Sequence, residues 1–279
     1  MIKQEQDCVR LNPRSPVLFG DDDMSDWNSN QYLKFKAERT QPSIDLVNRI
    51  NIENPQRIID IGCGPGNSTY ALKKRYPDAY ILGVDFSPNM IERAKSDYPE
   101  LDFMLFDATK DFDKLDEKFD IVFSNACIQW IPNHKKLLAD MMRILHTGGI
   151  LAIQKPCQEE MKIHAIISQL TNSDKWKDKF AKRREFYSLS DDEYFDLLSN
   201  ISADFSMWKT IYYHRLASQE SILEWYKSTG LKPYLEQLSD DDKTEFEKDI
   251  LLKIKEQYPL QKNNEVIFPF NRLFFTATK

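Results

Sequence analysis

A glycine-rich loop directly after a short apolar segment is the feature that most constrains the fold of this chain. Residues Arg57–Ile61 form an apolar run typical of a buried strand, and Gly62, Gly64 and Gly66 follow it. Glycine lets the backbone turn tightly and approach a ligand without an obstructing Cβ atom. A helical pattern over residues 67–76 comes next. A strand, a glycine loop and a helix in this order are typical of a nucleotide-binding α/β unit.

The segments around this unit alternate between strand and helix patterns, which predicts an α/β fold. Pro42 predicts the start of a helix over residues 43–48, because proline is favoured in a first helical turn. Strands are expected at residues 80–84, 102–106, 120–124 and 150–154, and helices at residues 87–97 and 135–145. Strands separated by helices of this length predict a parallel sheet with helices on both faces.

The two ends of the chain differ from this middle part. Beyond residue 155 we expect segments 159–200 and 215–260 to form a helical cap over the active site, and a last strand at residues 272–278. Residues 1–23 have no sustained hydrophobic period and no secretory signal. We interpret them as a tag-like or disordered leader, with a native disordered arm as the alternative, because Met24 is a plausible start.

Charge and cysteine content exclude several classes of protein. The chain has 38 Lys and Arg against 44 Asp and Glu, a net charge of −6, which argues against a nucleic-acid-binding protein. It has no run of about 18 apolar residues that would span a membrane. Cys8, Cys63, Cys127 and Cys157 form no CxxC pair, so they indicate free thiols and neither a zinc site nor a disulfide framework. We therefore expect a cytoplasmic monomer.

The glycine spacing and the strand ends indicate the kind of cofactor. A dinucleotide site has glycine at the first, third and sixth positions of the loop, but here Asn67 occupies the sixth. This favours an adenosine cofactor without a pyrophosphate. Ligands of parallel sheets bind at the carboxyl ends of the strands, where the sequence has Asp60, Asp85, Asp107 and Asn125. Asp60 near an ammonium group, Asp85 at ribose hydroxyls and Asp107 at adenine would fit S-adenosyl-L-methionine.

Several stretches of the chain resemble the class I S-adenosylmethionine-dependent methyltransferases, in particular those that esterify small polycarboxylic acids such as trans-aconitate. These stretches are residues 24–28, 37–39, 62–69, 129–132, 212–214, 229–233, 257–261 and 272–274. The resemblance implies a Rossmann-like sheet of seven strands, mostly parallel with an antiparallel last strand, flanked by helices and completed by the helical cap. It also implies one methyltransferase domain over residues 24–279, S-adenosyl-L-methionine as methyl donor, S-adenosyl-L-homocysteine as product and a methyl ester of a small anionic carboxylic acid.

The departures from this family leave other functions open. Residues 155–158 read Lys-Pro-Cys-Gln where the family tends to have a Met-Pro-Asp-Asn-like turn, and residues 161–185 look diverged. Another acceptor, such as a carrier-bound malonyl group or a longer-chain acid, is therefore an alternative. A nicotinamide-dependent oxidoreductase and a non-catalytic protein that binds S-adenosylmethionine are the alternatives from other classes.

The resemblance and the residues together predict the site. The expected cofactor-binding residues are Tyr32, Asp60, Gly62, Cys63, Gly64, Gly66, Asp85, Phe86, Met90, Asp107, Ala108 and Asn125. A carboxylate acceptor is ionised near neutral pH, since its unperturbed pKa is about 4, so we expect no general base and no metal. Orientation of the acceptor is assigned to Arg39, Trp130, Tyr212, Tyr213, His214 and Arg272. Tyr212 and Tyr213 alternate along a strand, so at most one of them would face the pocket.

Overall fold

The computed structural model describes residues 36–183, 185–227 and 229–279. The expected leader, residues 1–23, and the expected cofactor ligand Tyr32 lie outside the described residues. The strands are β1 (Arg57–Ile61), β2 (Tyr80–Asp85), β3 (Asp102–Leu105), β4 (Phe119–Asn125), β5 (Leu145–Pro156), β6 (Phe205–Leu216) and β7 (Val266–Thr278). They form one sheet in the order β3-β2-β1-β4-β5-β7-β6. Strands β1 to β5 pair in parallel, and β7 runs antiparallel to both β5 and β6, which confirms the predicted fold class.

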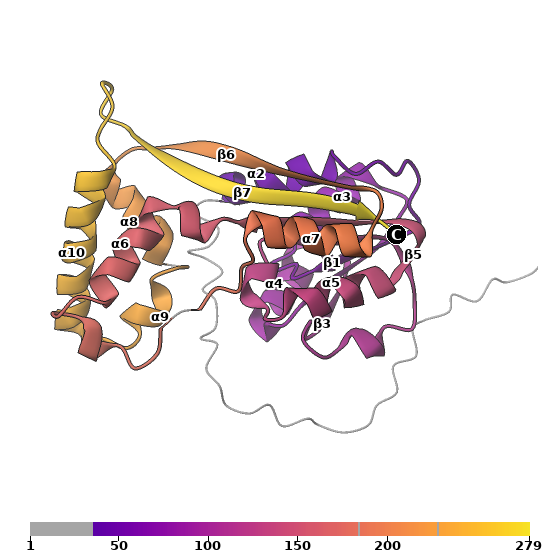
Figure 1. The fold of residues 1–279 in the computed structure, drawn as a ribbon, viewed down its shortest axis with the longest axis horizontal. Helices are drawn as coiled ribbons and strands as arrows, with labels where there is room; N and C mark the ends of the chain where they lie inside the picture. Colours follow the sequence, from indigo (N-terminus) through magenta and orange to yellow (C-terminus); the bar gives the residue numbers. More distant parts are fainter. Residues whose placement is uncertain (1–35, 184, 228) are drawn as a thin grey trace, which may run out of the picture.

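Helices cover both faces of this sheet (Figure 1). The helices on the two faces are α2 (Lys36–Val47), α3 (Asn67–Arg75), α4 (Pro88–Asp97), α5 (His134–Arg143) and α7 (Asp191–Ile201). The helices α6 (Lys162–Thr171), α8 (Gln219–Lys227), α9 (Lys232–Leu235) and α10 (Asp240–Gln257) lie away from the sheet (Figure 1). Successive strand residues face opposite sides, so Ile58 packs in the core with α2 and α3 while Ile59 packs in the core with α5 and α7. None of the described helices is long and apolar enough to cross a membrane.

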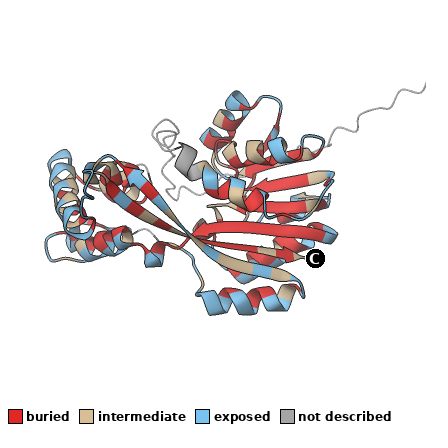
Figure 2. Cartoon of the chain, turned by 90° about the horizontal axis from the view of Figure 1, so that it is seen from above, coloured by how far each residue is buried: buried red, intermediate tan, exposed pale blue. Residues whose placement is uncertain are grey.

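A second hydrophobic core forms the cap. Strands β6 and β7 continue beyond the main sheet as a long hairpin, and α6, α8 and α10 pack together at its far end (Figure 2). Phe246 and Ile250 from α10 and Phe268 from β7 have no exposed surface in this second core. The cap is thus built on two strands of the main sheet.

Two predictions about helices were wrong. Helix α7 was expected in the cap, but Tyr194 and Leu198 pack with α5 in the core of the main sheet. An apolar helix face does not reveal which of two cores will bury it, so the sequence pattern was ambiguous. The first described helix begins at Lys36, and Pro42 lies inside it and not at its start. A helix tolerates an internal proline at the cost of one backbone hydrogen bond.

Candidate active site

The glycine loop between β1 and α3 has backbone conformations that favour glycine. The φ angles of Gly62, Gly64 and Gly66 are +75°, +54° and +88°. A Cβ atom on Gly62 would lie 2.1 Å from Sγ of Cys127, so a side chain does not fit there. A Cβ atom on Gly64 would meet nothing within 4 Å, and Gly64 lines the large cavity of the protein. The loop therefore presents bare backbone to the cavity at Gly64.

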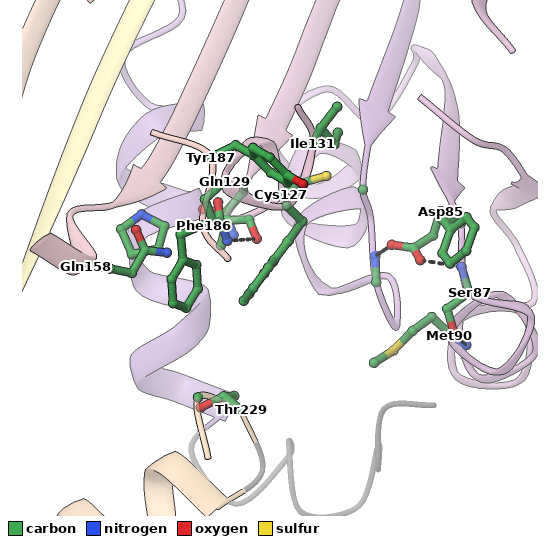
Figure 3. A pocket seen from close by; sticks show the side chains of 18 of the residues that line it. Asp85, Ser87, Met90, Cys127, Gln129, Ile131, Gln158, Phe186, Tyr187 and Thr229 are labelled. Atoms are coloured by element: carbon green, nitrogen blue, oxygen red, sulfur yellow. Dashed lines mark hydrogen bonds between the residues drawn. The ribbon is translucent and has the colours of Figure 1, made fainter. Parts of the chain in front are cut away.

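Asp85 holds this loop from the end of β2. Its Oδ2 accepts a hydrogen bond from the Gly64 N–H and its Oδ1 accepts one from the Ser87 N–H, both at 2.9 Å (Figure 3). Burial raises the pKa of Asp85, and the backbone hydrogen bonds oppose this shift. Each carboxylate oxygen can accept a second hydrogen bond. Asp85 can therefore bind two ribose hydroxyls while it holds the loop, as predicted for this position.

Asp60 lies beneath the loop and does not line the cavity. Its Oδ2 accepts hydrogen bonds from Oγ of Ser68 at 2.6 Å and from Oγ1 of Thr69 at 2.8 Å, which fixes the first turn of α3. Its Oδ1 is buried and has no hydrogen-bond partner in the described part of the chain. Burial raises the pKa of Asp60 to about 6, against the two side-chain hydrogen bonds. Asp60 thus supports the start of α3 next to the loop, while direct contact with a ligand stays a prediction.

The part of the cavity predicted to hold adenine is formed by residues that follow β2 and β3. Phe86, Met90, Asp107 and Ala108 all line it, as the sequence predicted. Oδ1 of Asp107 accepts a hydrogen bond from Oγ1 of Thr109 at 2.6 Å. Burial would raise the pKa of Asp107, but this bond and the nearby Lys110 ammonium outweigh it and the pKa is lowered. A charged Asp107 is therefore available to accept a hydrogen bond from an amino group.

Two buried acceptor oxygens follow the end of β4. Oδ1 of Asn125 and Oε1 of Gln129 find no hydrogen-bond partner in residues 36–183, 185–227 and 229–279, although both residues line the cavity. Nε2 of Gln129 donates to the carbonyl of Ala126 at 2.7 Å, which leaves its Oε1 as an acceptor. S-adenosylmethionine carries an ammonium and a sulfonium group, so unpartnered acceptor oxygens beside a bare glycine loop fit this cofactor.

The rest of the cavity, which we call the acceptor half, reaches from the sheet to the cap. The whole cavity measures about 1530 Å³. Figure 3 shows Asp85, Ser87 and Met90 on one side and Gln129, Gln158 and Phe186 on the other, with Thr229 from the cap below Phe186. The acceptor half is lined by Trp130, Pro156, Gln158, His164, Phe186, Tyr226, Thr229, Lys232, Phe270 and Arg272.

Arg272 brings a buried positive charge to this half. It lies on β7 opposite Pro156 of β5, is 5% exposed, and its guanidinium carbon lies 4.2 Å from the centroid of the Phe270 ring. Arginine binds carboxylates through two parallel hydrogen bonds. Trp130 also lines the cavity, with its ring centroid 4.9 Å from that of Phe186. These two predicted acceptor residues are therefore brought together by the fold.

The other predicted acceptor residues are not brought to the cavity. The Tyr212 hydroxyl donates to Oδ2 of Asp45 at 2.5 Å, Tyr213 is 65% exposed, and His214 packs against Trp225. None of Tyr212, Tyr213 and His214 lines the cavity, because the hairpin leaves the sheet before these residues and the cap covers one of its faces. Arg39 lies in α2, and its side chain is outside the described part of the chain.

The remaining loop residues divide between lining and support. Cys63 lines the cavity and is 3% exposed, and burial raises the pKa of its thiol. Gly66 does not line the cavity and instead caps α3. Among the described residues, no three His, Cys, Asp or Glu side chains come close enough to hold a metal.

Sequence reasoning missed several residues of the acceptor half. His164 and Tyr226 come from α6 and α8, and the Tyr226 hydroxyl lies 3.1 Å from Nε2 of His164. No local signal marks these two, because only the packing of the cap brings them together. Gln158 comes directly after β5, so the strand-end rule that found Asp85 would also have found it.

Known proteins share both the sequence and this architecture. A family model described as a methyltransferase domain matches residues 52–230. The chain is 36% identical over 256 residues to trans-aconitate 2-methyltransferase of Escherichia coli, which covers 92% of this chain and 99% of that protein. The YcgJ protein of Bacillus subtilis has a similar structure, with a TM-score of 0.55, 14% identity, and coverage of 86% of this chain and 98% of that one.

A further solved structure, Haemonchus contortus phosphoethanolamine N-methyltransferase 2 in complex with S-adenosylhomocysteine, gives a TM-score of 0.53 at 19% identity. It covers 86% of this chain and 52% of its own. The 14% and 19% identities to these solved structures show the fold alone. The match to the family model and the 36% identity to the Escherichia coli protein show family membership. The chain therefore belongs to the class I S-adenosylmethionine-dependent methyltransferases.

Proposed function

We propose that this protein transfers a methyl group from S-adenosylmethionine to a carboxylate of trans-aconitate or a related small polycarboxylic acid, which gives a methyl ester. The observation that carries this proposal is the similarity to trans-aconitate 2-methyltransferase along 99% of that protein. It extends over 92% of the chain, well beyond the family match at residues 52–230. It therefore includes the cap, which supplies much of the acceptor half.

The cofactor site is proposed to be formed by the loop and the strand ends. Gly64 offers its backbone, Asp85 accepts from the ribose hydroxyls, and Asn125 and Gln129 face the ammonium group with their unpartnered oxygens. When bound, S-adenosylmethionine supplies an electrophilic methyl group on a positively charged sulfur. The chain itself supplies position and a closed environment.

The acceptor needs orientation and not activation. A carboxylate with an ordinary pKa of about 4 is already a nucleophilic anion at neutral pH, so no side chain has to remove a proton. Arg272 would bind a carboxylate that does not react, with the two parallel hydrogen bonds that arginine favours. Trp130 and Phe186 wall the cavity and exclude water from it. Orientation of this kind lowers a barrier by about 7–11 kcal/mol in favourable cases.

The domain and its setting are also proposals. We take residues 24–279 as the methyltransferase domain and expect a cytoplasmic monomer. The three described cysteines, Cys63, Cys127 and Cys157, are all free thiols, which agrees with a reducing compartment.

A labelling assay tests the proposed function. The protein is incubated with methyl-labelled S-adenosylmethionine and, separately, with trans-aconitate, cis-aconitate, citrate, isocitrate and a malonyl carrier protein. We expect label on trans-aconitate that mild base releases as methanol, because esters hydrolyse there. Base-stable label would exclude an ester, and label on the malonyl carrier alone would favour the alternative acceptor.

A further inference from the structure

Gln158 is a buried polar side chain in the acceptor half whose carboxamide oxygen has no partner among the described residues. The residue is 5% exposed and lines the cavity, and its buried Oε1 makes no hydrogen bond within the part of the chain that the structure describes. Figure 3 shows it on the same side of the cavity as Gln129 and Phe186, opposite Asp85 and Met90. Buried polar groups are normally hydrogen-bonded, and leaving one unpaired is destabilising. A carboxamide kept in this position therefore points to a ligand that pairs with it.

The fold places Gln158 next to Arg272 at one edge of the sheet. Pro156, the last residue of β5, pairs with Arg272 of β7. The Cys157 N–H donates to the carbonyl of Asn271 at 2.9 Å, so the ladder continues for one more residue. Gln158 then opens the short helix η3 (Gln158–Glu160). Both side chains line the cavity, Gln158 from just beyond the end of β5 and Arg272 from the middle of β7.

These two side chains offer complementary groups for a polycarboxylate. The Arg272 guanidinium supplies charge and a planar pair of donors. A carboxamide has two N–H donors and one acceptor oxygen, and the orientation of its end is set by the hydrogen bonds that it makes. Gln158 can therefore present Nε2 to a second carboxylate, and as a neutral group it adds no charge to the cavity.

We propose that Gln158 binds a non-reacting carboxylate of the acceptor beside the carboxylate bound by Arg272, and so selects tricarboxylic over dicarboxylic acids. This inference rests on the proposed function, because it concerns the acceptor of the same reaction. It makes Gln158 a substrate-contacting specificity residue.

The chain contains a matched control for a purely structural role. Gln154 lies four residues earlier on β5 and is fully buried, and neither polar atom of its carboxamide has a partner among the residues that the structure describes. Unlike Gln158, it does not line the cavity. Substituting either glutamine by methionine keeps the length of the side chain and removes the carboxamide. Only the Gln158 variant removes a group that a ligand can reach.

The experiment compares the wild-type protein with Gln158→Met, Gln158→Glu and Gln154→Met. Steady-state kinetics use trans-aconitate and three unsaturated dicarboxylates, mesaconate, trans-glutaconate and itaconate, each of which lacks a different one of its three carboxylates. Calorimetry measures the binding of the same acids to protein saturated with S-adenosylhomocysteine, so that unreactive acids are also tested.

For Gln158→Met we expect the KM and the Kd for trans-aconitate to rise about 10- to 100-fold, because a hydrogen bond to a charged group is lost. The kcat should change little. Gln158→Glu should show a larger rise, because it places a carboxylate against a carboxylate. For the dicarboxylate that lacks the contacted group, Gln158→Met should match the wild type within about twofold. Gln154→Met should leave the selectivity unchanged.

Two results separate the failure of this inference from that of the proposed function. Equal losses for all four acids in Gln158→Met, or no loss for trans-aconitate, would overturn the role of Gln158 alone. A wild-type protein that neither methylates nor binds trans-aconitate would overturn both.

Discussion

Asp85 accepts a hydrogen bond from the backbone N–H of Gly64, with 2.9 Å between the nitrogen and Oδ2. This bond joins the glycine loop after β1 to the end of β2. The carboxylate expected at the ribose and the backbone expected near the methionine part of the cofactor are thus held as one unit. A substitution at Asp85 removes a ligand contact and releases the loop at the same time.

We predict that Asp85→Ala weakens the binding of S-adenosylhomocysteine by about 1–3 kcal/mol, because charge-assisted hydrogen bonds are lost. Asp85→Asn should weaken it less, since one oxygen remains as an acceptor. Calorimetric titration measures both affinities. Asp113→Ala serves as a control, because the Asp113 side chain is 90% exposed and lies outside the cavity. Wild-type affinity in Asp85→Ala would show that the cofactor binds elsewhere.

Two glycines of the loop should differ in what alanine does to them. Gly62→Ala forces a Cβ atom to within 2.1 Å of Sγ of Cys127, whereas Gly64→Ala meets only open space. Both need a positive φ, which costs an alanine about 1–2 kcal/mol. We expect Gly64→Ala to lose about that free energy of unfolding and Gly62→Ala to lose about 2–5 kcal/mol in urea denaturation. Equal losses would contradict the contact with Cys127.

His214 should make the protein less stable in acid. Burial, with a smaller contribution from the Arg272 charge, lowers its pKa to about 4 from an unfolded value of 6.5. Between these pH values the unfolded state binds more protons than the folded state. The contribution of neutral His214 to the free energy of unfolding is therefore complete above pH 6.5 and is lost as the pH falls towards 4. We expect this to lower the free energy of unfolding by about 2–3 kcal/mol.

The variant His214→Phe isolates this effect, because other groups titrate equally in both proteins. Urea denaturation at pH 7 and at pH 4.5 should show a smaller drop in the free energy of unfolding for His214→Phe than for the wild type. The same drop in both proteins would mean that His214 is not buried in its neutral form.

The two kinds of strand-derived site residue show what the sequence could predict. Asp85 and Asp107 were found because ligands meet the carboxyl ends of parallel strands, a rule that needs only the strand boundaries. Tyr213 and His214 were misassigned because their strand continues past the sheet edge into the cap hairpin. Strand alternation says that two neighbours face opposite sides, but not what covers either side.

The cap residues show a different reason for failure. His164 and Tyr226 are 62 positions apart and meet only when α6 and α8 pack on the hairpin. Nothing near either residue in the sequence carries that information. Helix α7 was assigned to the wrong core for a related reason, since its apolar face would suit either one.

Arg272 and Tyr213 give a direct test of the corrected acceptor site. Arg272→Lys keeps the positive charge but loses the paired donors, so we expect the KM for trans-aconitate to rise about 10-fold or more. Tyr213→Ser should leave the KM within about twofold of the wild type, because exposed side chains away from a site have small effects. A KM that responds to Tyr213 and not to Arg272 would reverse the correction.

Gln154 should be a site where stability increases on substitution. Its carboxamide is buried, and neither of its polar atoms has a partner among the described residues. Burial of unpaired polar atoms lowers the free energy of unfolding. We expect Gln154→Met to raise the free energy of unfolding by about 1 kcal/mol, measured by urea denaturation. A lower stability would indicate that the carboxamide has a partner in solution.

Strands β6 and β7 pair without interruption from Phe205 and Ala277 in the main sheet to Leu216 and Val266 under the cap. The lid of the active site is thus an outgrowth of the sheet, carried by these two strands. Any movement of the lid has to be taken up by bending two hydrogen-bonded strands, which is stiffer than flexing a loop. Because the same two strands belong to the sheet and to the lid, the lid is unsuitable for exchange between relatives as a separate module. A new acceptor then has to be accommodated by substitutions of side chains on these strands and on the cap helices.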